Sequence, residues 1–342
     1  MRAGLSGKRS MTKTANKDYR QEKMRKKQDA IVISQTELAA GIYDLQLSAP
    51  QIAEQAQAGQ FVNVYCADNS RLLPRPISLA GIDRGKGEIR LIYRVSGAGT
   101  EEFSRLQAGD AVEVLGPLGN GFSVKENLAE QTRKQVFLIG GGIGIPPLLE
   151  TAKALTAEKK AGCNITAEKK AGCSMTVTAV LGYRDRNTFL ADEFEAVCDR
   201  VLVASEDGSV GARGTVLDAM REAGVIPQKG QDTKSGITQA KEDSKQSIPQ
   251  KKENEEKKPA GAAETEPVWF ACGPTPMLRA LKTCAAENGI ACWLSLEERM
   301  ACGVGACLAC VCQTAEKDEH SQVKNRRVCK DGPVFRAEEI VL

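Results

Sequence analysis

Four cysteines near the C-terminus constrain this chain more than any other feature. Three follow a C-x4-C-x2-C spacing in a glycine-containing stretch, and one comes after a polar interval: Cys302, Cys307, Cys310 and Cys329. Thiolates this close in sequence can surround one inorganic centre, and their spacing is that of plant-type [2Fe-2S] ligation. Zinc sites usually pair two C-x2-C motifs, and disulfide frameworks are typical of small secreted chains. The spacing therefore favours an iron-sulfur cluster, although Cys312 is a fifth nearby thiol and leaves the choice of four open.

The composition indicates a multidomain protein without a nucleic-acid or membrane role. At 342 residues, the chain exceeds what one hydrophobic core normally serves. Its net charge of +3 is too small over this length to argue for nucleic-acid binding. No run approaches the roughly 18 apolar residues of a transmembrane helix, and the N-terminus lacks the apolar core of a secretory signal. We therefore expect a cytoplasmic protein, and the single histidine, His320, argues against histidine-based catalysis.

Three segments are expected to be additions to the folded part. Residues 1–27 are rich in Lys and Arg and poor in large apolar residues, which predicts a disordered basic tail. Residues 228–266 contain mostly Lys, Asp, Glu and small polar residues, which predicts a disordered insertion on a surface loop. The segment Thr156–Cys163 recurs identically as Thr166–Cys173, and two copies are too few for a solenoid. We expect this duplication to lengthen a helix or loop.

Residues 28–126 have the pattern of an antiparallel β-barrel. Alternation of apolar and polar residues is clearest where Ile89, Leu91 and Tyr93 fall on one face of a strand. Turn residues separate the six strands that we expect: Ala30–Ser34, Ile42–Leu47, Gln60–Cys66, Pro76–Leu79, Glu88–Val95 and Ala111–Leu115.

Residues 133–290 have the alternating strands and helices of a doubly wound parallel α/β sheet. The buried strand Val136–Ile139 leads into a glycine loop and then into a helix with one apolar face. Further buried strands are expected at Thr176–Tyr183, Arg200–Ser205 and Val268–Cys272. The remaining residues, 291–342, should form a small domain with the cluster as its core, because the cysteine loop itself offers little to bury.

Two motifs in the predicted barrel have the residue types of a flavin site. In Leu73-Pro74-Arg75-Pro76-Ile77-Ser78, two prolines restrict the backbone around a guanidinium that can grip a diphosphate. A surface arginine at a rigid strand start would look the same. The second motif, Tyr93-Arg94-Val95-Ser96-Gly97-Ala98-Gly99-Thr100, follows a strand, and we expect Thr100 to be the N-cap of a helix whose amides attract phosphate.

Two loops in the predicted α/β region have the character of a dinucleotide site. Gly142-x-Gly144-x-x-Pro147 lies between a strand and a helix, with proline in place of the third glycine of the fingerprint. No acidic residue about twenty positions on marks a ribose contact. Cys272, Gly273 and Pro274 follow a buried strand at its carboxyl end, where open parallel sheets bind ligands. Taken alone, Cys272 also fits an inert buried thiol.

The order of these motifs resembles the ferredoxin-NADP reductase superfamily, in which a flavin barrel precedes a nicotinamide domain. With the C-terminal cysteine pattern, the chain is similar to the electron-transfer subunits of NAD-dependent dihydroorotate dehydrogenase, an enzyme of pyrimidine biosynthesis. The resemblance implies FAD, a [2Fe-2S] cluster and NAD as co-substrate. It also implies a partner, the FMN-containing catalytic subunit, in a two-plus-two heterotetramer. Electrons would then pass from FMN through the cluster and FAD to NAD.

The same resemblance assigns roles to residues. It implies that Arg75, Pro76, Ile77 and Ser78 hold the flavin, that Tyr93 and Arg94 flank it, and that Gly97, Gly99 and Thr100 meet its diphosphate. It assigns the NAD site to Gly142, Gly144, Cys272, Gly273 and Pro274, and the cluster to Cys302, Cys307, Cys310 and Cys329.

Two alternatives stay open. The first is a related flavin and iron-sulfur subunit of another oxidoreductase, such as a ferredoxin:NADP transhydrogenase, a sulfide dehydrogenase or a hydrogenase. Arg184 and Arg186 follow a predicted strand and could meet the 2'-phosphate of NADP. Four cysteines favour the dihydroorotate family, because the transhydrogenase pattern has Asp in place of one. The second alternative is a zinc-bound, non-catalytic binding module on a reductase scaffold.

Overall fold

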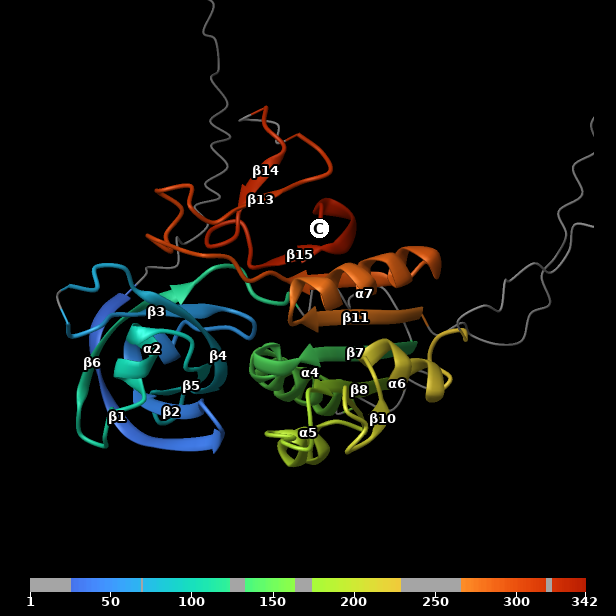
Figure 1. Ribbon diagram of the computed structural model, residues 1–342, viewed down its shortest axis with the longest axis horizontal. Helices are drawn as coiled ribbons and strands as arrows, with labels where there is room; N and C mark the ends of the chain where they lie inside the picture. The colour runs from blue at the N-terminus through green and yellow to red at the C-terminus, as the bar shows by residue number, and fades with distance from the viewer. Residues whose placement is uncertain (1–25, 69, 124–132, 164–173, 229–265, 318–321) are drawn as a thin grey trace, which may run out of the picture.

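The computed structural model describes residues 26–68, 70–123, 133–163, 174–228, 266–317 and 322–342. They form a barrel, a seven-stranded sheet with its helices, and a C-terminal segment that lies over both (Figure 1). The basic tail up to residue 25, the second copy of the duplication and residues 229–265 of the insertion lie outside these ranges. In the described ranges, no helix is both long and apolar enough to cross a bilayer.

The barrel confirms the predicted architecture. Its six strands close in the order β1-β2-β5-β4-β3-β6, and all their pairings are antiparallel. Alternate side chains such as Leu45, Leu79 and Leu91 fill the interior. The elements of this region are β1 (Lys26–Ala39), β2 (Ile42–Ser48), α1 (Pro50–Ala53), β3 (Phe61–Val64), β4 (Arg75–Asp83), β5 (Glu88–Arg94), α2 (Ala98–Phe103) and β6 (Ala111–Leu118).

The large sheet confirms the predicted doubly wound fold. Its order is β10-β9-β8-β7-β11-β12-β15, and all neighbours are parallel except β12 and β15. Its strands are β7 (Arg133–Gly141), β8 (Ser174–Tyr183), β9 (Arg200–Ser205), β10 (Ala212–Arg213), β11 (Glu266–Cys272), β12 (Ala291–Ser295) and β15 (Val334–Arg336). After β7 the chain adds strands on one side, and from β11 it adds them on the other. The carboxyl ends of β7 and β11 therefore lie at the topological switch point, where such sheets bind ligands.

Helices connect and cover these strands. The first copy of the duplicated segment, Thr156–Cys163, forms the last turns of α4, so this copy lengthens a helix as expected. The helices are η1 (Gly142–Gly144), α4 (Pro146–Cys163), α5 (Ala191–Val197), α6 (Val216–Glu222) and α7 (Thr275–Glu287). In Figure 1, α4 lies at the end of the sheet that faces the barrel.

The C-terminal segment contributes strands to two sheets. β13 (Val311–Gln313) and β14 (Asn325–Arg327) form a small antiparallel pair, and η2 (Ala337–Glu339) follows β15. β15 extends the large sheet through its antiparallel pairing with β12. The large sheet thus continues past residue 290, and a boundary at that residue crosses it.

Candidate functional site

The two predicted flavin motifs meet at one corner of the barrel. Arg75 begins β4, and its guanidinium donates to the Leu73 carbonyl. The same guanidinium lies against Gly99 in the first turn of α2, where a Cβ would come within 2.4 Å of Arg75 Nε. The absence of a side chain at 99 permits this close approach, and a Cβ there would displace the Arg75 guanidinium. The contact places a permanent positive charge beside a turn of small residues, which suits a diphosphate.

Thr100 has a different role from the one expected. Gly97, not Thr100, is the N-cap of α2, and Thr100 lies in the first turn of the helix. Its Oγ1 accepts hydrogen bonds from the backbone nitrogens of Ser96 and Gly97, at 2.9 and 3.2 Å. The N-cap prediction was wrong because the helix begins on small residues that carry no capping group, and Thr100 folds back to satisfy the amides before it.

Strands β4 and β5 direct the remaining flavin candidates to opposite sides of the barrel wall. Ile77 packs towards the barrel core, so Pro76 and Ser78 lie on the outer face of β4. Tyr93 is buried in the barrel, stacks on Tyr43 with ring centroids 5.9 Å apart, and donates to Gln35. Burial raises the pKa of its hydroxyl. Tyr93 therefore offers its backbone rather than its ring to a ligand outside the barrel.

The predicted nicotinamide loops lie together at the switch point. Cys272 and Gly140 are partners in the β11–β7 ladder, and the glycine loop follows directly. A Cβ on Gly144 would come within 2.3 Å of the Cys272 carbonyl oxygen, so only glycine allows this contact. The structure thus brings Gly142 and Gly144 together with Cys272, Gly273 and Pro274, although 130 positions separate Gly142 from Cys272 (272 − 142).

The Cys272 thiol is held in its neutral form. Burial, opposed by a hydrogen bond with Ser295 and assisted by the negative charge of Glu297, raises its pKa to about 12. A neutral, weakly polar thiol at a strand end can contact an apolar ring without adding charge. Part of Cys272 is exposed, but its sulfur, the atom that titrates, is enclosed.

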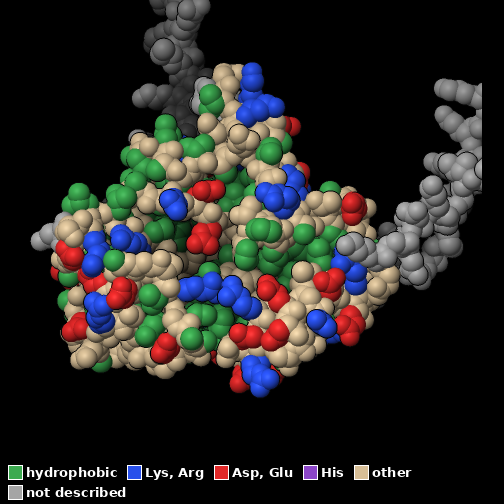
Figure 2. Space-filling model, in the orientation of Figure 1, with side chains coloured by type: hydrophobic (Ala, Val, Ile, Leu, Met, Phe, Trp, Pro, Cys, Tyr) green, Lys and Arg blue, Asp and Glu red, His purple; other side chains and the backbone are tan. Residues whose placement is uncertain are grey.

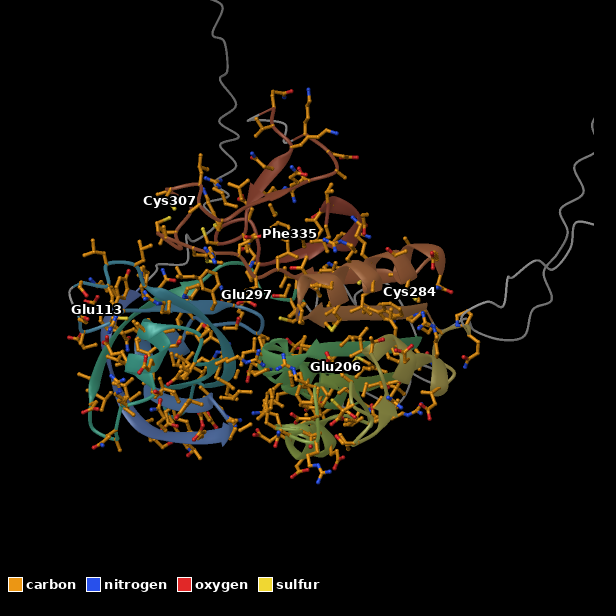
Figure 3. The ribbon with its side chains drawn as sticks, viewed as in Figure 1. Glu113, Glu206, Cys284, Glu297, Cys307 and Phe335 are labelled. Carbon is orange, nitrogen blue, oxygen red and sulfur yellow. The ribbon has the colours of Figure 1, made fainter. Side chains whose placement is uncertain are left out.

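Arg94 connects the flavin motif to the nicotinamide loop. It is exposed at the end of β5, and its Nη2 lies 3.6 Å from where a Cβ on Gly142 would stand. Figure 2 shows a recess between the barrel and the sheet, with acidic side chains at its edge and basic ones beside it. Glu297 lies where the barrel, the sheet and the C-terminal segment meet (Figure 3). The barrel and sheet candidates therefore face a common space.

The four predicted cluster ligands form two pairs. The backbone nitrogen of Cys302 lies 3.5 Å from Cys307 Sγ, and the nitrogen of Cys329 lies 3.4 Å from Cys310 Sγ. The sulfur of Cys302 also accepts from the Val304 and Ala306 amides, at 3.4 and 3.2 Å. None of the described cysteines forms a disulfide. Backbone amides directed at sulfur are typical of sites that hold thiolates.

Electrostatics distinguishes the two pairs. Burial opposes ionisation of Cys302, but hydrogen bonds from Val304, Cys307 and Ala306 outweigh it and lower its pKa to about 6. Burial, together with the neighbouring Cys310 and Cys302 sulfurs, raises the pKa of Cys329 to about 12. The two pairs are neighbours, because Gly305, between Cys302 and Cys307, lies against the Lys330 side chain next to Cys329. The Cys302 thiol is thus ready to lose a proton, while the Cys329 thiol needs a cation beside it to do so.

The donor set fits a [2Fe-2S] centre better than a single zinc ion. Two adjacent pairs match a centre in which each of two irons takes two protein ligands, whereas structural zinc takes four around one ion. Cys312 is engaged elsewhere: it is buried in β13, and its thiol donates to the Arg326 carbonyl. Burial raises its pKa.

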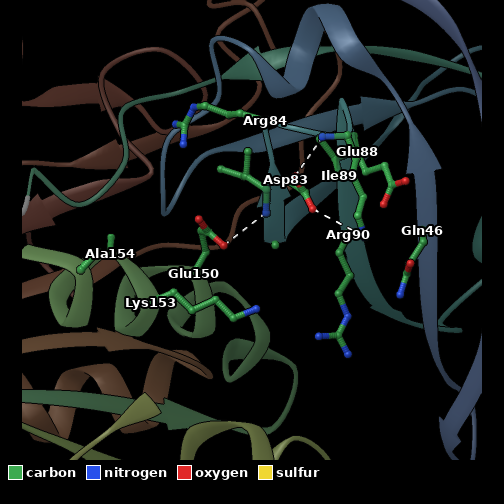
Figure 4. A pocket seen from close by; sticks show the side chains of 13 residues that line it. Gln46, Asp83, Arg84, Glu88, Ile89, Arg90, Glu150, Lys153 and Ala154 are labelled. Carbon is green, nitrogen blue, oxygen red and sulfur yellow. Dashed lines mark hydrogen bonds and ion pairs between the residues drawn. The ribbon is translucent and has the colours of Figure 1, made fainter. Parts of the chain in front are cut away.

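A groove between the barrel and α4 lies away from all these candidates. Its lining includes Arg90 from β5, Glu150 and Lys153 from α4, and Gln46 from β2 (Figure 4). The Ile82 amide donates to Glu150 across it. Because none of the predicted flavin, nicotinamide or cysteine residues lines it, we do not assign the redox chemistry to this groove.

Two asparagines that the sequence did not single out anchor the C-terminal segment. Asn63 Nδ2 donates to the Cys302 carbonyl at 3.2 Å, and Asn120 Nδ2 donates to the Lys330 carbonyl at 3.0 Å. Asn63 lies in β3, and Asn120 follows β6. The acceptor of Asn63 belongs to the predicted ligand Cys302, and that of Asn120 to the residue after Cys329. Asn63 alternates with Val62 and Val64, which places it on the outer face of β3, and the distant cysteine loop covers it there.

Family models match both ends of the chain. The model "Oxidoreductase FAD-binding domain" matches residues 29–122, and "Iron-sulfur cluster binding domain of dihydroorotate dehydrogenase B" matches residues 297–341. The first range holds the barrel with its two flavin motifs, and the second holds all four predicted cysteine ligands.

Curated relatives match nearly the whole chain. A "Dihydroorotate dehydrogenase B (NAD(+)), electron transfer subunit" from Geobacillus sp. strain WCH70 is 35% identical over 320 residues, covering 93% of this chain and 100% of the relative. The protein of the same name from Bacillus caldolyticus is 38% identical over 312 residues, covering 91% of this chain and 97% of the relative.

Solved structures share the fold. The structure of an NADH-dependent reduced ferredoxin-NADP oxidoreductase is 26% identical, covers 91% of this chain and 89% of its own, and has a TM-score of 0.66. A ferredoxin NADP+ reductase from Neisseria gonorrhoeae, at 13% identity and a TM-score of 0.52, covers 77% of this chain and 92% of its own and shows the fold alone. With two whole-length relatives above 30% identity, the chain belongs to the family of electron transfer subunits of NAD(+)-dependent dihydroorotate dehydrogenase B.

Proposed function

We propose that this chain accepts electrons from an FMN-containing dihydroorotate dehydrogenase catalytic subunit and delivers them through a [2Fe-2S] cluster and FAD to NAD+. One observation carries the proposal: the flavin strand β4 is the meeting point of the other two candidate sites. Through Asn63 on the neighbouring strand it adjoins the cysteine loop, and through Arg94 on the other neighbouring strand it adjoins Gly142. The chain thereby places sites for one-electron and two-electron chemistry side by side.

For the flavin, we assign the diphosphate to Arg75 and the turn of Gly97, Gly99 and Thr100. The arginine is always charged, and the absence of a side chain at 99 lets it lie directly over the turn. Pro76 and Ser78, on the outer face of β4, lie beside the ring system, with Ile77 holding the strand from inside. Tyr93 contributes its backbone to this site, and Arg94 contributes its guanidinium.

For NAD, we assign the loop of Gly142 and Gly144 to the diphosphate and Cys272, Gly273 and Pro274 to the nicotinamide end. The carboxyl ends of β7 and β11 support this placement. Bound flavin and nicotinamide supply hydride chemistry that needs ring stacking rather than a protein acid or base. The chain therefore has to orient the two rings and exclude water, and the neutral Cys272 thiol suits both tasks.

For the cluster, we assign Cys302 and Cys307 to one iron and Cys310 and Cys329 to the other. The amides of Val304 and Ala306, which already donate to Cys302, would stabilise the negative charge of a thiolate centre. We leave Cys312 outside the ligand set because its thiol faces the Arg326 carbonyl.

We also assign functional units and a setting. Residues 28–126 would carry FAD, residues 133–290 NAD, and residues 291–342 the cluster, with the tail 1–27 and the insertion 228–266 as additions. Reduced thiols and a nicotinamide substrate support a cytoplasmic location. We place two copies of the chain with two catalytic subunits in a heterotetramer, which a mass measurement of the complex tests directly.

A second candidate function is an NADH-linked ferredoxin reductase. The structure at 26% identity with a TM-score of 0.66 favours it. The curated relatives favour the dihydroorotate assignment, because they are 35–38% identical over comparable coverage. The two candidates differ in the protein that delivers electrons.

Co-purification with a spectrum and an activity assay tests the proposal. We expect a yellow-brown protein with stoichiometric FAD and two irons per chain, bound to an FMN-containing subunit. With dihydroorotate and NAD+, the complex should produce NADH, whereas the chain alone should not. A colourless protein containing zinc would refute the redox assignment. A partner with further iron-sulfur clusters and no dihydroorotate oxidation would favour the ferredoxin reductase.

A further inference from the structure

Asn63 is a polar side chain buried on the outside of the barrel. It is 0% exposed, while Val62 and Val64 on either side pack into the barrel core. Asn63 therefore lies on the outer face of β3, as does Phe61. The C-terminal segment covers that face, because Phe61 shares one hydrophobic cluster with Cys310 and Cys329.

The Asn63 amide holds the cysteine loop directly. Its Nδ2 donates to the Cys302 carbonyl oxygen at 3.2 Å. Gly303 lies flat against the same group, since a Cβ there would come within 2.3 Å of Asn63 Nδ2. Gly303 also has a φ of +65°, which favours glycine. The contact thus depends on the Asn63 amide in the barrel and on a residue without a side chain, Gly303, in the cysteine loop.

The same residue adjoins the flavin strand. Asn63 pairs with Pro76 in the β3–β4 ladder, and directly opposite residues have Cβ atoms about 4.5–5.5 Å apart. Pro76 belongs to the motif that we assign to the flavin. One hydrogen bond and one cross-strand pair therefore separate a candidate cluster ligand, Cys302, from the flavin strand.

Packing alone does not explain an asparagine here. Its Oδ1 is buried and accepts no hydrogen bond from the residues that the structure describes, which costs about 1–3 kcal/mol for a typical group. Leucine has a similar volume and would fill the site without that cost. The residue makes physical sense if the donor that it presents to Cys302 is what the protein needs.

We propose that Asn63 is a positioning residue for electron transfer between the cluster and the flavin, acting through the Cys302 backbone. The inference rests on the proposed function. Asn63 forms and breaks no covalent bond; it keeps the loop that carries Cys302 at a fixed separation from β4. Groups that orient metal ligands from outside the ligand set typically change affinity or activity about 10–100-fold when they are replaced.

Rapid mixing of the FAD- and iron-loaded protein with NADH tests the inference. The absorbance record separates reduction of the flavin from the later reduction of the cluster. Asn63→Leu removes the donor at similar volume, so flavin reduction and iron content should stay as in the wild type. Cluster reduction should slow about 10–100-fold. In the same variant, hydrogen–deuterium exchange of residues 300–306 should rise, which reports on the anchor independently of activity.

Two further variants make the result decisive. Asn63→Asp keeps the shape but lacks the N–H donor, so it should slow cluster reduction as well, and it serves if the leucine variant does not fold. Asn288 Nδ2 donates to the Cys284 carbonyl at 2.8 Å at the end of α7, so Asn288→Leu removes a matched bond away from the barrel and should leave both rates unchanged. Wild-type rates and exchange in both Asn63 variants would overturn the inference. A wild-type protein without flavin or iron would overturn the proposed function instead.

Discussion

The barrel meets the rest of the molecule at two interfaces with different polar contacts. Towards the sheet and its helices, Arg90 pairs with Glu193 of α5 while also holding Asp44 in the barrel, both at 2.7 Å. Towards the C-terminal segment, Asn63 and Asn120 donate to backbone carbonyls beside the cysteines. Both interfaces also bury apolar side chains. One interface thus relies on charged side chains at a groove, and the other on neutral amides bound to the main chain.

The difference suits two tasks. The proposed function requires NAD to enter and leave between the barrel and the sheet. An ion pair such as Arg90–Glu193, whose side chains are 17% and 39% exposed, holds that interface less firmly than buried contacts do. The cluster stays in place and must keep its distance from the flavin. Amides directed at main-chain carbonyls, together with a shared apolar core, resist displacement better than long charged side chains. We therefore expect the cluster side to be rigid and the nicotinamide side to adjust.

The largest expected effect comes from removing a cysteine that belongs to the cluster side. Cys307→Ser should lose the iron and weaken binding of the catalytic subunit, while FAD remains bound, because the loop has little else to organise it. Iron analysis and the visible spectrum measure this. Cys312→Ser, at a buried thiol outside the two pairs, should keep its iron. Unchanged iron in Cys307→Ser would refute the ligand assignment.

The next effect concerns the apolar contact beneath the cysteines. Phe61→Ala should lower the free energy of unfolding by about 3–5 kcal/mol, because Phe61 is 3% exposed and packs with Cys310 and Cys329. Denaturant unfolding of the holo-protein measures the loss. Leu73→Ala, at a side chain 53% exposed, should stay within about 0.5 kcal/mol of the wild type. If Phe61→Ala lowered the free energy of unfolding by no more than about 0.5 kcal/mol, Phe61 and the two cysteines would not share a core.

The charged interface should be weaker. Arg90→Met should lower the free energy of unfolding by about 2 kcal/mol. The substitution leaves Asp44, which is only 8% exposed, without its guanidinium partner. Unfolding at low and high salt measures it. Arg105→Met breaks the exposed pair with Glu101 and should cost about 0.5 kcal/mol or less. If Arg90→Met cost as much as Phe61→Ala, the two interfaces would not differ as described.

The smallest effect is the acid sensitivity of Glu193. The hydrogen bond from Arg90, opposed by desolvation, holds the pKa of Glu193 below its usual value. Its contribution to stability is therefore complete above the unfolded pKa of about 4.3 and is lost as pH falls through the lower folded pKa. Because the side chain is 39% exposed, we expect less than about 1 kcal/mol. Wild type and Glu193→Gln should differ near neutral pH and converge in acid; a constant difference would contradict this assignment.

Local patterns predicted most of the regular structure. The six barrel strands and the buried strands of the sheet follow from alternation and from apolar runs, because these depend on which face of a strand is buried. Short-range spacing also identified the cysteines, since three of them lie in one loop. The short strands β13, β14 and β15 carry no comparable pattern, and β15 forms only because β12 offers it an edge.

The start of helix α2 and the contacts between distant segments could not be predicted in this way. Thr100 has the residue type of an N-cap, but helix α2 begins three residues earlier because Gly97 takes that position. Asn63 has the alternation of a solvated residue, yet a segment 239 positions away in sequence covers it. The helix start was missed within a short run of small residues, whereas the burial of Asn63 depends on a distant segment, about which no local pattern carries information.

The sequence by itself determined the kinds of site expected in this protein: a barrel with an arginine suited to phosphate, a glycine loop after a buried strand, and four thiols with iron-sulfur spacing. Residue type and short-range spacing decide these, because they set charge, backbone freedom and the reach of ligands. Only the tertiary structure decided how the sites adjoin. It paired Cys302 with Cys307 and Cys310 with Cys329, and it buried Asn63 between the cysteine loop and the flavin strand, since burial depends on surfaces brought together by the whole fold.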